Sequence, residues 1–230
     1  MNLLNRPAIK SEARSFISVD KRWLSIFWAF FIVSLFGFAA GLVTAPIGIP
    51  SENSEDYYST AYLSLIIINI LIILIMPLAV SLYGYRLNCL RNNEFNAKYI
   101  FSITKPNYFK FLFTEIVRGI FIYLWFLLLI IPGYIKAIAY SMTGYIICDN
   151  PDLSPVDAVS LSNKITKGYK WDIFVMYLSF IPWYLLGSIT LGIGYIYVIP
   201  YMGITEAMFY ENLKKNAIET GIATPAEFGA

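Results

Sequence analysis

The chain has 230 residues, of which 58% are hydrophobic, 17% are aromatic and only 14% are charged. A soluble domain carries about 25% charged residues, so this composition indicates a membrane protein. The net charge of +2 says nothing about partners until the charges are assigned to the two sides of a bilayer. The sequence contains no histidine, which excludes His-based zinc sites and catalysis of the Ser-His-Asp or Cys-His type.

The first 22 residues are largely polar and lack the apolar region and cleavage site of a signal peptide. We therefore expect this segment to be retained. Ile9, Ala13, Phe16 and Ile17 share one helical face, which favours an amphipathic helix at the membrane surface.

Apolar runs bounded by aromatic, basic or turn residues predict an all-α, polytopic transmembrane bundle of six spans, arranged as three hairpins with interfacial amphipathic helices. The second run is the clearest, because it is an almost continuous series of Ile and Leu. The fourth is short, since 16 residues at about 1.5 Å each reach only about 24 Å. The predicted spans are residues 23–44, 61–85, 109–131, 133–148, 172–191 and 194–210.

Charged residues indicate the orientation of these spans. The loop 46–58 carries three acidic residues and no basic residue, so we expect it on the outer side. Of the seventeen Lys and Arg residues, all except Lys136 fall in segments that we assign to the cytoplasmic side. We therefore expect a bacterial plasma-membrane protein with both termini inside, a single membrane domain at 1–215 and a flexible cytoplasmic tail at 216–230.

A polar amphipathic segment separates the fourth and fifth predicted spans. Ser154, Pro155 and Asp157 form a typical helix start, and an apolar face that includes Leu161 and Ile165 follows. Such a basic amphipathic helix either lies flat on an anionic inner leaflet or packs as a connector under the bundle.

The pattern repeats along the chain. Three stretches each combine an amphipathic segment, a basic-aromatic step and an apolar hairpin. The turns at Gly133 and Gly194 also align, with similar residues following each of them at a constant offset of 61. We expect three quasi-equivalent units that run in the same direction through the membrane.

Among the ionisable residues inside or next to predicted spans, four are candidates for an intramembrane polar cluster: Arg86, Glu115, Arg118 and Glu206. A charge in the middle of a lone transmembrane helix costs about 2.5–3.5 kcal/mol, so these residues need partners. Glu115 and Arg118 are three residues apart and pair on one helix face, while Glu206 pairs with Arg118 or with Arg86. The cluster is either a network that holds the helices in register or a cytoplasm-facing site for a headgroup or ion.

Four stretches carry a family resemblance: IKSEAR, IIPGYIKAIAYSM, DNPDLSPVDAVSLSNKITKGYKWD and LLGSITLGIGYIYVIPYMGITEAMFYENLK. Together they resemble the bacterial family of integral membrane proteins catalogued as domain of unknown function 975, over about residues 8 to 214. The resemblance implies a membrane topology but no activity and no catalytic residue. More distantly, the PG turn and the NP-x-L-S-P segment are similar to the membrane domain that accompanies some glycerophosphodiester phosphodiesterases, whose hydrolase is a separate domain.

No phosphate-binding glycine loop, metal-ligand cluster or nucleophile with a neighbouring base occurs in the sequence. We therefore expect a non-enzymatic multi-pass membrane protein with no catalytic residue, cofactor, metal or nucleic-acid partner. It would act as an accessory factor in contact with the lipid bilayer, binding anionic lipid headgroups or another membrane protein. The alternative is a small transporter or permease-like protein with a cytoplasm-facing polar site, a reading that Pro77, Pro182 and Pro200 support.

Overall fold

The computed structural model describes residues 4–43 and 55–229, and every regular element within them is a helix. This confirms the all-α fold class. Two short 3-10 helices, η1 (Val19–Lys21) and η2 (Pro225–Phe228), accompany ten α-helices in the described residues. The α-helices are α1 (Arg6–Ser18), α2 (Arg22–Val43), α3 (Glu55–Asn92), α4 (Lys98–Leu128), α5 (Ile130–Ala139), α6 (Thr143–Asp149), α7 (Pro155–Ile165), α8 (Lys170–Leu178), α9 (Ile181–Ile189) and α10 (Tyr195–Glu219).

Three stretches of the described residues are long and apolar enough to cross a membrane: Asn69–Asn92, Lys98–Leu128 and Lys170–Ile189. The prediction of six spans is not supported. The predicted fourth span is divided between α5 and α6 by a turn at residues 140–142, and the ten residues of α5 rise only about 15 Å. The predicted outer loop at 46–58 lies largely outside the described residues.

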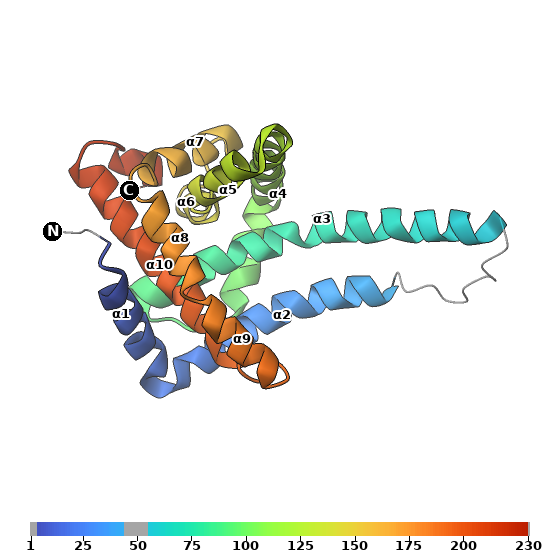
Figure 1. The fold of residues 1–230 in the computed structure, drawn as a ribbon, viewed down its shortest axis with the longest axis horizontal. Coiled ribbons are helices and arrows are strands. Elements are labelled where there is room, and N and C mark those ends of the chain that lie inside the picture. The colour runs from blue at the N-terminus through green and yellow to red at the C-terminus, as the bar shows by residue number, and fades with distance from the viewer. Residues whose placement is uncertain (1–3, 44–54, 230) are drawn as a thin grey trace.

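Helices α2 and α3 lie side by side and project away from the remaining helices (Figure 1). Large apolar side chains are exposed along the projecting part of α3, at the α4–α5 turn and at the α9–α10 turn. Ile66, Ile131 and Ile189 are examples, one from each place. Exposed apolar surface of this extent is typical of a membrane-contacting protein, which agrees with the three apolar stretches.

The α4–α5 and α9–α10 turns share a close backbone approach. A β-carbon at Gly133 would lie 2.6 Å from the ring of Phe126, and one at Gly194 would lie 2.8 Å from the Cα of Gly187. Phe126 and Gly187 each precede their glycine by seven residues, so the contacts occupy equivalent positions in the two units. The glycines at these positions let the second helix of each unit begin close against the first.

Helix α7 forms where the sequence predicts it. Pro155 occupies the first turn, and the Ser154 hydroxyl oxygen accepts a hydrogen bond from the Asp157 backbone nitrogen at 3.1 Å. The apolar face of α7 is buried, and Ser162 donates a hydrogen bond to the carbonyl of Ala139 at 2.8 Å. The helix therefore packs as a connector against the end of α5.

The C-terminal segment differs from the prediction of a flexible tail at 216–230. Helix α10 continues to Glu219, and η2 follows. Phe228 is 2% exposed, and the Asn150 side-chain nitrogen donates a hydrogen bond to the Ala226 carbonyl at 3.1 Å. Residues 216–229 are thus folded onto the bundle, because Ala217, Ala223 and Phe228 bury their side chains in its apolar core.

Candidate functional site

Side chains of α3, α6 and α10 meet in a layer that we call the first polar layer: Arg86, Tyr145 and Glu206. Nη1 of Arg86 lies 3.1 Å from Oε2 of Glu206. The Tyr145 hydroxyl donates to the same oxygen at 3.1 Å, and the Tyr177 hydroxyl of α8 donates to Oε1 at 2.5 Å. The Glu206 carboxylate is therefore held by one cation and two phenols.

This layer is largely shielded from solvent. The side chains of Arg86 and Glu206 are 16% and 11% exposed. Removing one member of such a pair leaves an uncompensated charge, which costs about 3–5 kcal/mol when the site is buried. The pair therefore fixes the relative position of α3 and α10.

The other two residues of the predicted cluster form a second pair beside the first. Nη2 of Arg118 lies 2.5 Å from Oε2 of Glu115 on α4. Tyr83 lies between the two pairs, because it is within electrostatic range of Arg118 and Glu115 and its ring lies 5.6 Å from the Arg86 guanidinium. The structure thus brings all four predicted residues together. It also pairs Glu206 with Arg86 and not with Arg118.

A hollow of about 260 Å³ opens beside the first polar layer; we call it the Arg86 hollow. It is lined by Phe30 of α2, Arg86 of α3, Tyr184 of α9, and Ile199, Met202, Gly203 and Glu206 of α10. Its walls are mostly apolar, and its charged groups are one arginine and one glutamate. Among the described residues, only Nη1 of the Arg86 guanidinium is hydrogen-bonded.

Gly203 is the position that admits Arg86. A β-carbon at Gly203 would lie 2.6 Å from Nε and 2.8 Å from Cζ of the arginine. These distances are shorter than van der Waals contact, so any side chain here would displace the guanidinium. The guanidinium group of Arg86 therefore packs closely beside Gly203 of α10.

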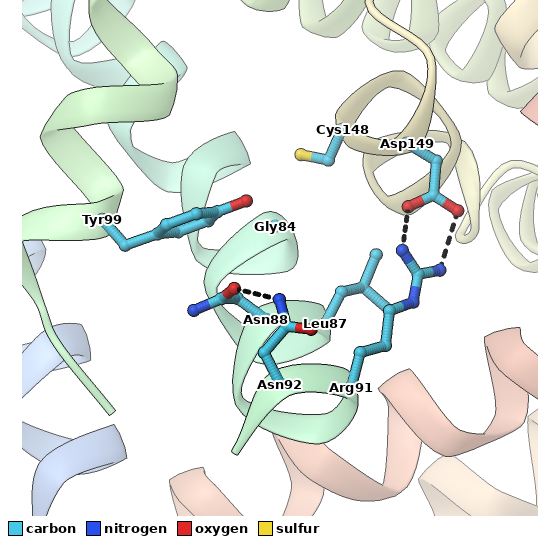
Figure 2. A pocket seen from close by; sticks show the side chains of 8 residues that line it. All are labelled: Gly84, Leu87, Asn88, Arg91, Asn92, Tyr99, Cys148 and Asp149. Carbon is cyan, nitrogen blue, oxygen red and sulfur yellow. Dashed lines mark hydrogen bonds and ion pairs between the residues drawn. The ribbon is translucent and has the colours of Figure 1, made fainter. Parts of the chain in front are cut away.

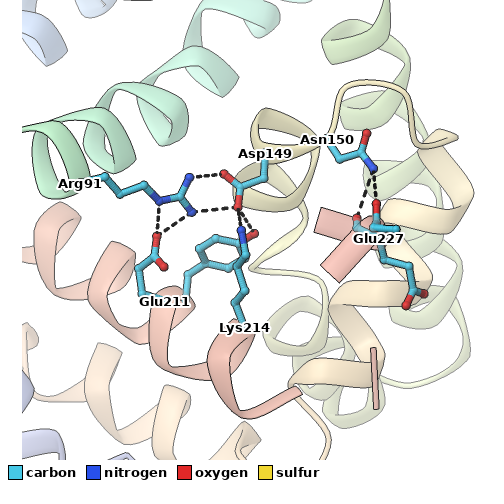
Figure 3. Close-up of polar contacts among 8 residues, drawn as sticks. Arg91, Asp149, Asn150, Glu211, Lys214 and Glu227 are labelled. Carbon is cyan, nitrogen blue, oxygen red and sulfur yellow. Dashed lines mark hydrogen bonds and ion pairs between the residues drawn. The ribbon is translucent and has the colours of Figure 1, made fainter. Parts of the chain in front are cut away.

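One helical turn further along, a second polar layer joins the same three helices: Arg91, Asp149 and Tyr210. Figure 3 shows the contact between Arg91 and Asp149. Arg91 binds both oxygens of the Asp149 carboxylate, at 2.7 and 2.9 Å. Tyr210 donates to that carboxylate at 2.9 Å, and Lys214 does so at 2.6 Å. Arg91 also reaches Glu211 at 2.7 Å.

Asp149 is the centre of the second polar layer, and its side chain is 4% exposed. Burial alone would raise the pKa of its carboxyl group. The hydrogen bonds and charges of Arg91 and Lys214 outweigh that effect and hold the pKa below the ordinary value of 3.8. Asp149 is therefore a carboxylate at neutral pH, which matches its two cationic neighbours.

A smaller hollow of about 150 Å³ lies against the second polar layer (Figure 2). It is lined by Gly84, Leu87, Asn88, Arg91, Asn92, Tyr99, Cys148 and Asp149. Its polar groups already bond to one another: the Asn92 amide donates to Asn88 at 2.8 Å, and Arg91 is engaged by Asp149. This hollow therefore offers fewer free hydrogen-bonding groups than the Arg86 hollow.

Sequence reasoning did not identify the second polar layer. Asp149 stands in an Asp-Asn-Pro-Asp segment, which predicts a turn. Tyr210 is predicted to be an aromatic residue at a helix end. The repeat offers a signal for both. Tyr145 and Glu206 are 61 residues apart, as are Asp149 and Tyr210, so hydrogen bonds join residues at equivalent positions of the second and third units.

We predict that Gly203→Ala lowers the free energy of unfolding by about 1–3 kcal/mol, because the added β-carbon forces Arg86 away from Glu206. Circular dichroism during thermal unfolding of the detergent-solubilised protein measures this. Gly119→Ala on α4 is the matched control: nothing lies within 4 Å of its β-carbon, so helix propensity makes it neutral or stabilising. Equal stability of the two variants would contradict the role assigned to Gly203.

Comparisons with known proteins return one family. No curated protein and no solved structure matches the chain. The model of the family described as "Protein of unknown function (DUF975)" matches residues 62–217. The match starts later than the expected residue 8, and it contains all four residues of the predicted cluster and both polar layers. Because the match covers more than half of the chain, this protein belongs to the DUF975 family of proteins of unknown function.

Proposed function

We propose that the chain is a non-enzymatic, multi-pass protein of the bacterial plasma membrane that binds a phospholipid headgroup in the Arg86 hollow. The observation that carries the proposal is the state of the Arg86 guanidinium. An arginine has five N–H donors. Those on Nε and Nη2 have no hydrogen-bond partner among the described residues. Donors of this kind beside a hollow bind a phosphate through two parallel hydrogen bonds.

The remaining groups of the hollow favour a headgroup that carries both a phosphate and an amine. A carboxylate has about four acceptor positions, and Glu206 uses three of them for Arg86, Tyr145 and Tyr177. The fourth would accept a hydrogen bond from an ammonium group. Phe30 and Met202 supply apolar walls for the adjoining glycerol and acyl carbons.

The size of the hollow also supports a headgroup. Its volume of about 260 Å³ is below the about 300–1,000 Å³ of pockets that enclose whole small molecules. A headgroup needs less space, because its acyl chains remain outside in the bilayer. The proposal therefore assigns the function of an accessory lipid-binding protein and no chemical reaction.

The proposed topology has both termini on the cytoplasmic side, which requires an even number of crossings. Three stretches qualify by length and composition, so at least one further segment must cross the membrane. The distribution of basic residues supports this orientation. Lys136, which the sequence assigns to the outer side, lies within electrostatic range of Lys170, so we propose that these two lysines lie on the same side of the membrane.

A transporter or permease-like protein is the second candidate. Two prolines favour it: Pro77 inside α3 and Pro200 inside α10, because a proline removes a backbone hydrogen bond and allows a helix to bend. Pro200 is adjacent to Ile199, which lines the Arg86 hollow. Substrate-dependent flux into liposomes that contain the purified protein would favour this candidate over a lipid-binding role.

We predict that the purified protein in detergent retains dioleoylphosphatidylethanolamine and that Arg86→Lys weakens this binding about tenfold, because lysine cannot form the bidentate contact. Native mass spectrometry measures the retained lipid. Arg14→Gln, which removes an exposed arginine of α1, is the control and should bind as the unmodified chain does. Met202→Trp fills the hollow without touching the ion pair and should also prevent binding.

Two outcomes would contradict this prediction. One is retention of the lipid by Met202→Trp, which would place the lipid elsewhere. The other is binding of inorganic phosphate in preference to the lipid, which would make the hollow a site for a free anion.

Cysteine labelling tests the topology. In a chain whose Cys89 and Cys148 are replaced by alanine, a cysteine at Ser54 should react with a membrane-impermeant maleimide added to intact cells. One at Lys215, which is exposed on α10, should react only after the cells are opened. The reverse pattern would overturn the proposed orientation, and labelling of both positions in intact cells would put them on the same side.

A further inference from the structure

An apolar groove of about 440 Å³ lies between α5 and α8, away from the Arg86 hollow. Ile131, Ile135 and Ile138 line it from α5, and Trp171 and Phe174 line it from α8. Trp171 is 69% exposed, although burial of so large an apolar ring is favourable. An elongated apolar molecule would cover these side chains.

One end of the groove is strongly basic. Lys170, the first residue of α8, is part of the lining, and Lys136 and Lys167 lie within electrostatic range of it. Among the ion pairs of the described residues, none involves any of these three lysines. The nearby carboxylate of Asp172 is engaged by Arg6 at 3.6 Å.

Lys136 has aromatic neighbours in place of an anion. Its Nζ lies 4.7 Å from the centre of the Trp125 ring and 5.7 Å from that of Tyr140. Such cation–π contacts orient the ammonium group but leave its positive charge uncompensated. Three like charges repel one another, so an anion between them would remove an unfavourable interaction.

We propose that this groove binds an anionic phospholipid, with one acyl chain against α5 and α8 and the phosphate among Lys136, Lys167 and Lys170. Lysine binds phosphate as a point charge and does not need a fixed geometry, which suits three side chains from different segments. An exposed tryptophan next to the lysines is the arrangement found where helices pass the headgroup level.

The length of the groove fits a chain that runs from the lysines into the bilayer. Lys170 begins α8, and Phe174 lies one turn further along the helix. On α5, Ile138 and Ile131 are about two turns apart, and Ile131 lies next to the exposed α4–α5 turn. The apolar path thus leads from the basic end of the groove to the exposed apolar end of the α4–α5 hairpin.

This proposal rests on the membrane location proposed above but not on headgroup binding in the Arg86 hollow, because the two sites share no residue. The nature of the preferred lipid also differs. The lysines select net negative charge, whereas the Arg86–Glu206 pair favours a headgroup with both charges.

The test compares retention of dioleoylphosphatidylglycerol and dioleoylphosphatidylcholine by the purified full chain, measured by native mass spectrometry from detergent micelles. We expect the unmodified protein to prefer the anionic lipid about tenfold. The triple variant Lys136→Gln, Lys167→Gln and Lys170→Gln should lose this preference. The control variant Lys98→Gln, Lys105→Gln and Lys215→Gln removes the same charge from exposed positions elsewhere and should keep it.

A second variant keeps the proposal testable if the triple variant does not fold. Ile135→Trp fills the groove and leaves every lysine in place, so it should also lose retention of the anionic lipid. Absence of a preference in the unmodified protein, or equal loss in the two triple variants, would overturn the proposal. Loss of the preference in Arg86→Lys alone would assign the anionic lipid to the Arg86 hollow and overturn the groove site.

Discussion

The ion pair between Arg86 and Glu206 is the interaction on which the arrangement of this protein depends. Two charges that lie among apolar helices are tolerated only when each is paired and hydrogen-bonded. Glu206 meets that requirement through Arg86 and the hydroxyls of Tyr145 and Tyr177. Because these four side chains come from α3, α10, α6 and α8, one carboxylate fixes the relative positions of four helices.

The second polar layer extends the same principle by one helical turn. Asp149 receives hydrogen bonds from Arg91, Tyr210 and Lys214, so it joins α6 to both α3 and α10. In each layer a carboxylate accepts from a tyrosine that stands 61 residues away in the sequence. In the first layer the tyrosine, Tyr145, belongs to α6 and the carboxylate, Glu206, belongs to α10. In the second layer the tyrosine, Tyr210, belongs to α10 and the carboxylate, Asp149, belongs to α6. Residues at equivalent positions therefore face each other, as expected where two related units meet along parallel helices.

The sequence predicts those features of the fold that arise from local patterns. Ser154 and Pro155 start a helix by side-chain capping and a fixed backbone angle, and both effects act within one turn. The four charged residues of the cluster stand out because charge is rare in apolar segments. Because each of these charges needs a partner of opposite sign and few are available, the sequence also predicts how they pair. The exception is Glu206, for which only the packing of the helices decides between Arg86 and Arg118.

Features that depend on tertiary packing could not be predicted in the same way. The turn at residues 140–142 contains neither proline nor glycine, so hydropathy reads residues 133–148 as one short span. The local sequence predicts that Asp149 is a turn residue, because its cationic partners Arg91 and Lys214 are brought to it only by the fold. The C-terminal segment looks like a polar tail, and only the burial of Phe228 against the bundle reveals that it is folded.

A double-mutant cycle on Arg86 and Glu206 tests the central claim most directly. The free energies of unfolding of Arg86→Gln, Glu206→Gln and the double variant would be measured in detergent, next to the same cycle for the exposed pair Lys215 and Glu219, whose charged atoms are 3.9 Å apart. We expect a coupling energy of about 2–3 kcal/mol for Arg86 and Glu206 and about 0–0.5 kcal/mol for the exposed pair. Additive losses at Arg86 and Glu206 would show that the ion pair does not hold α3 against α10.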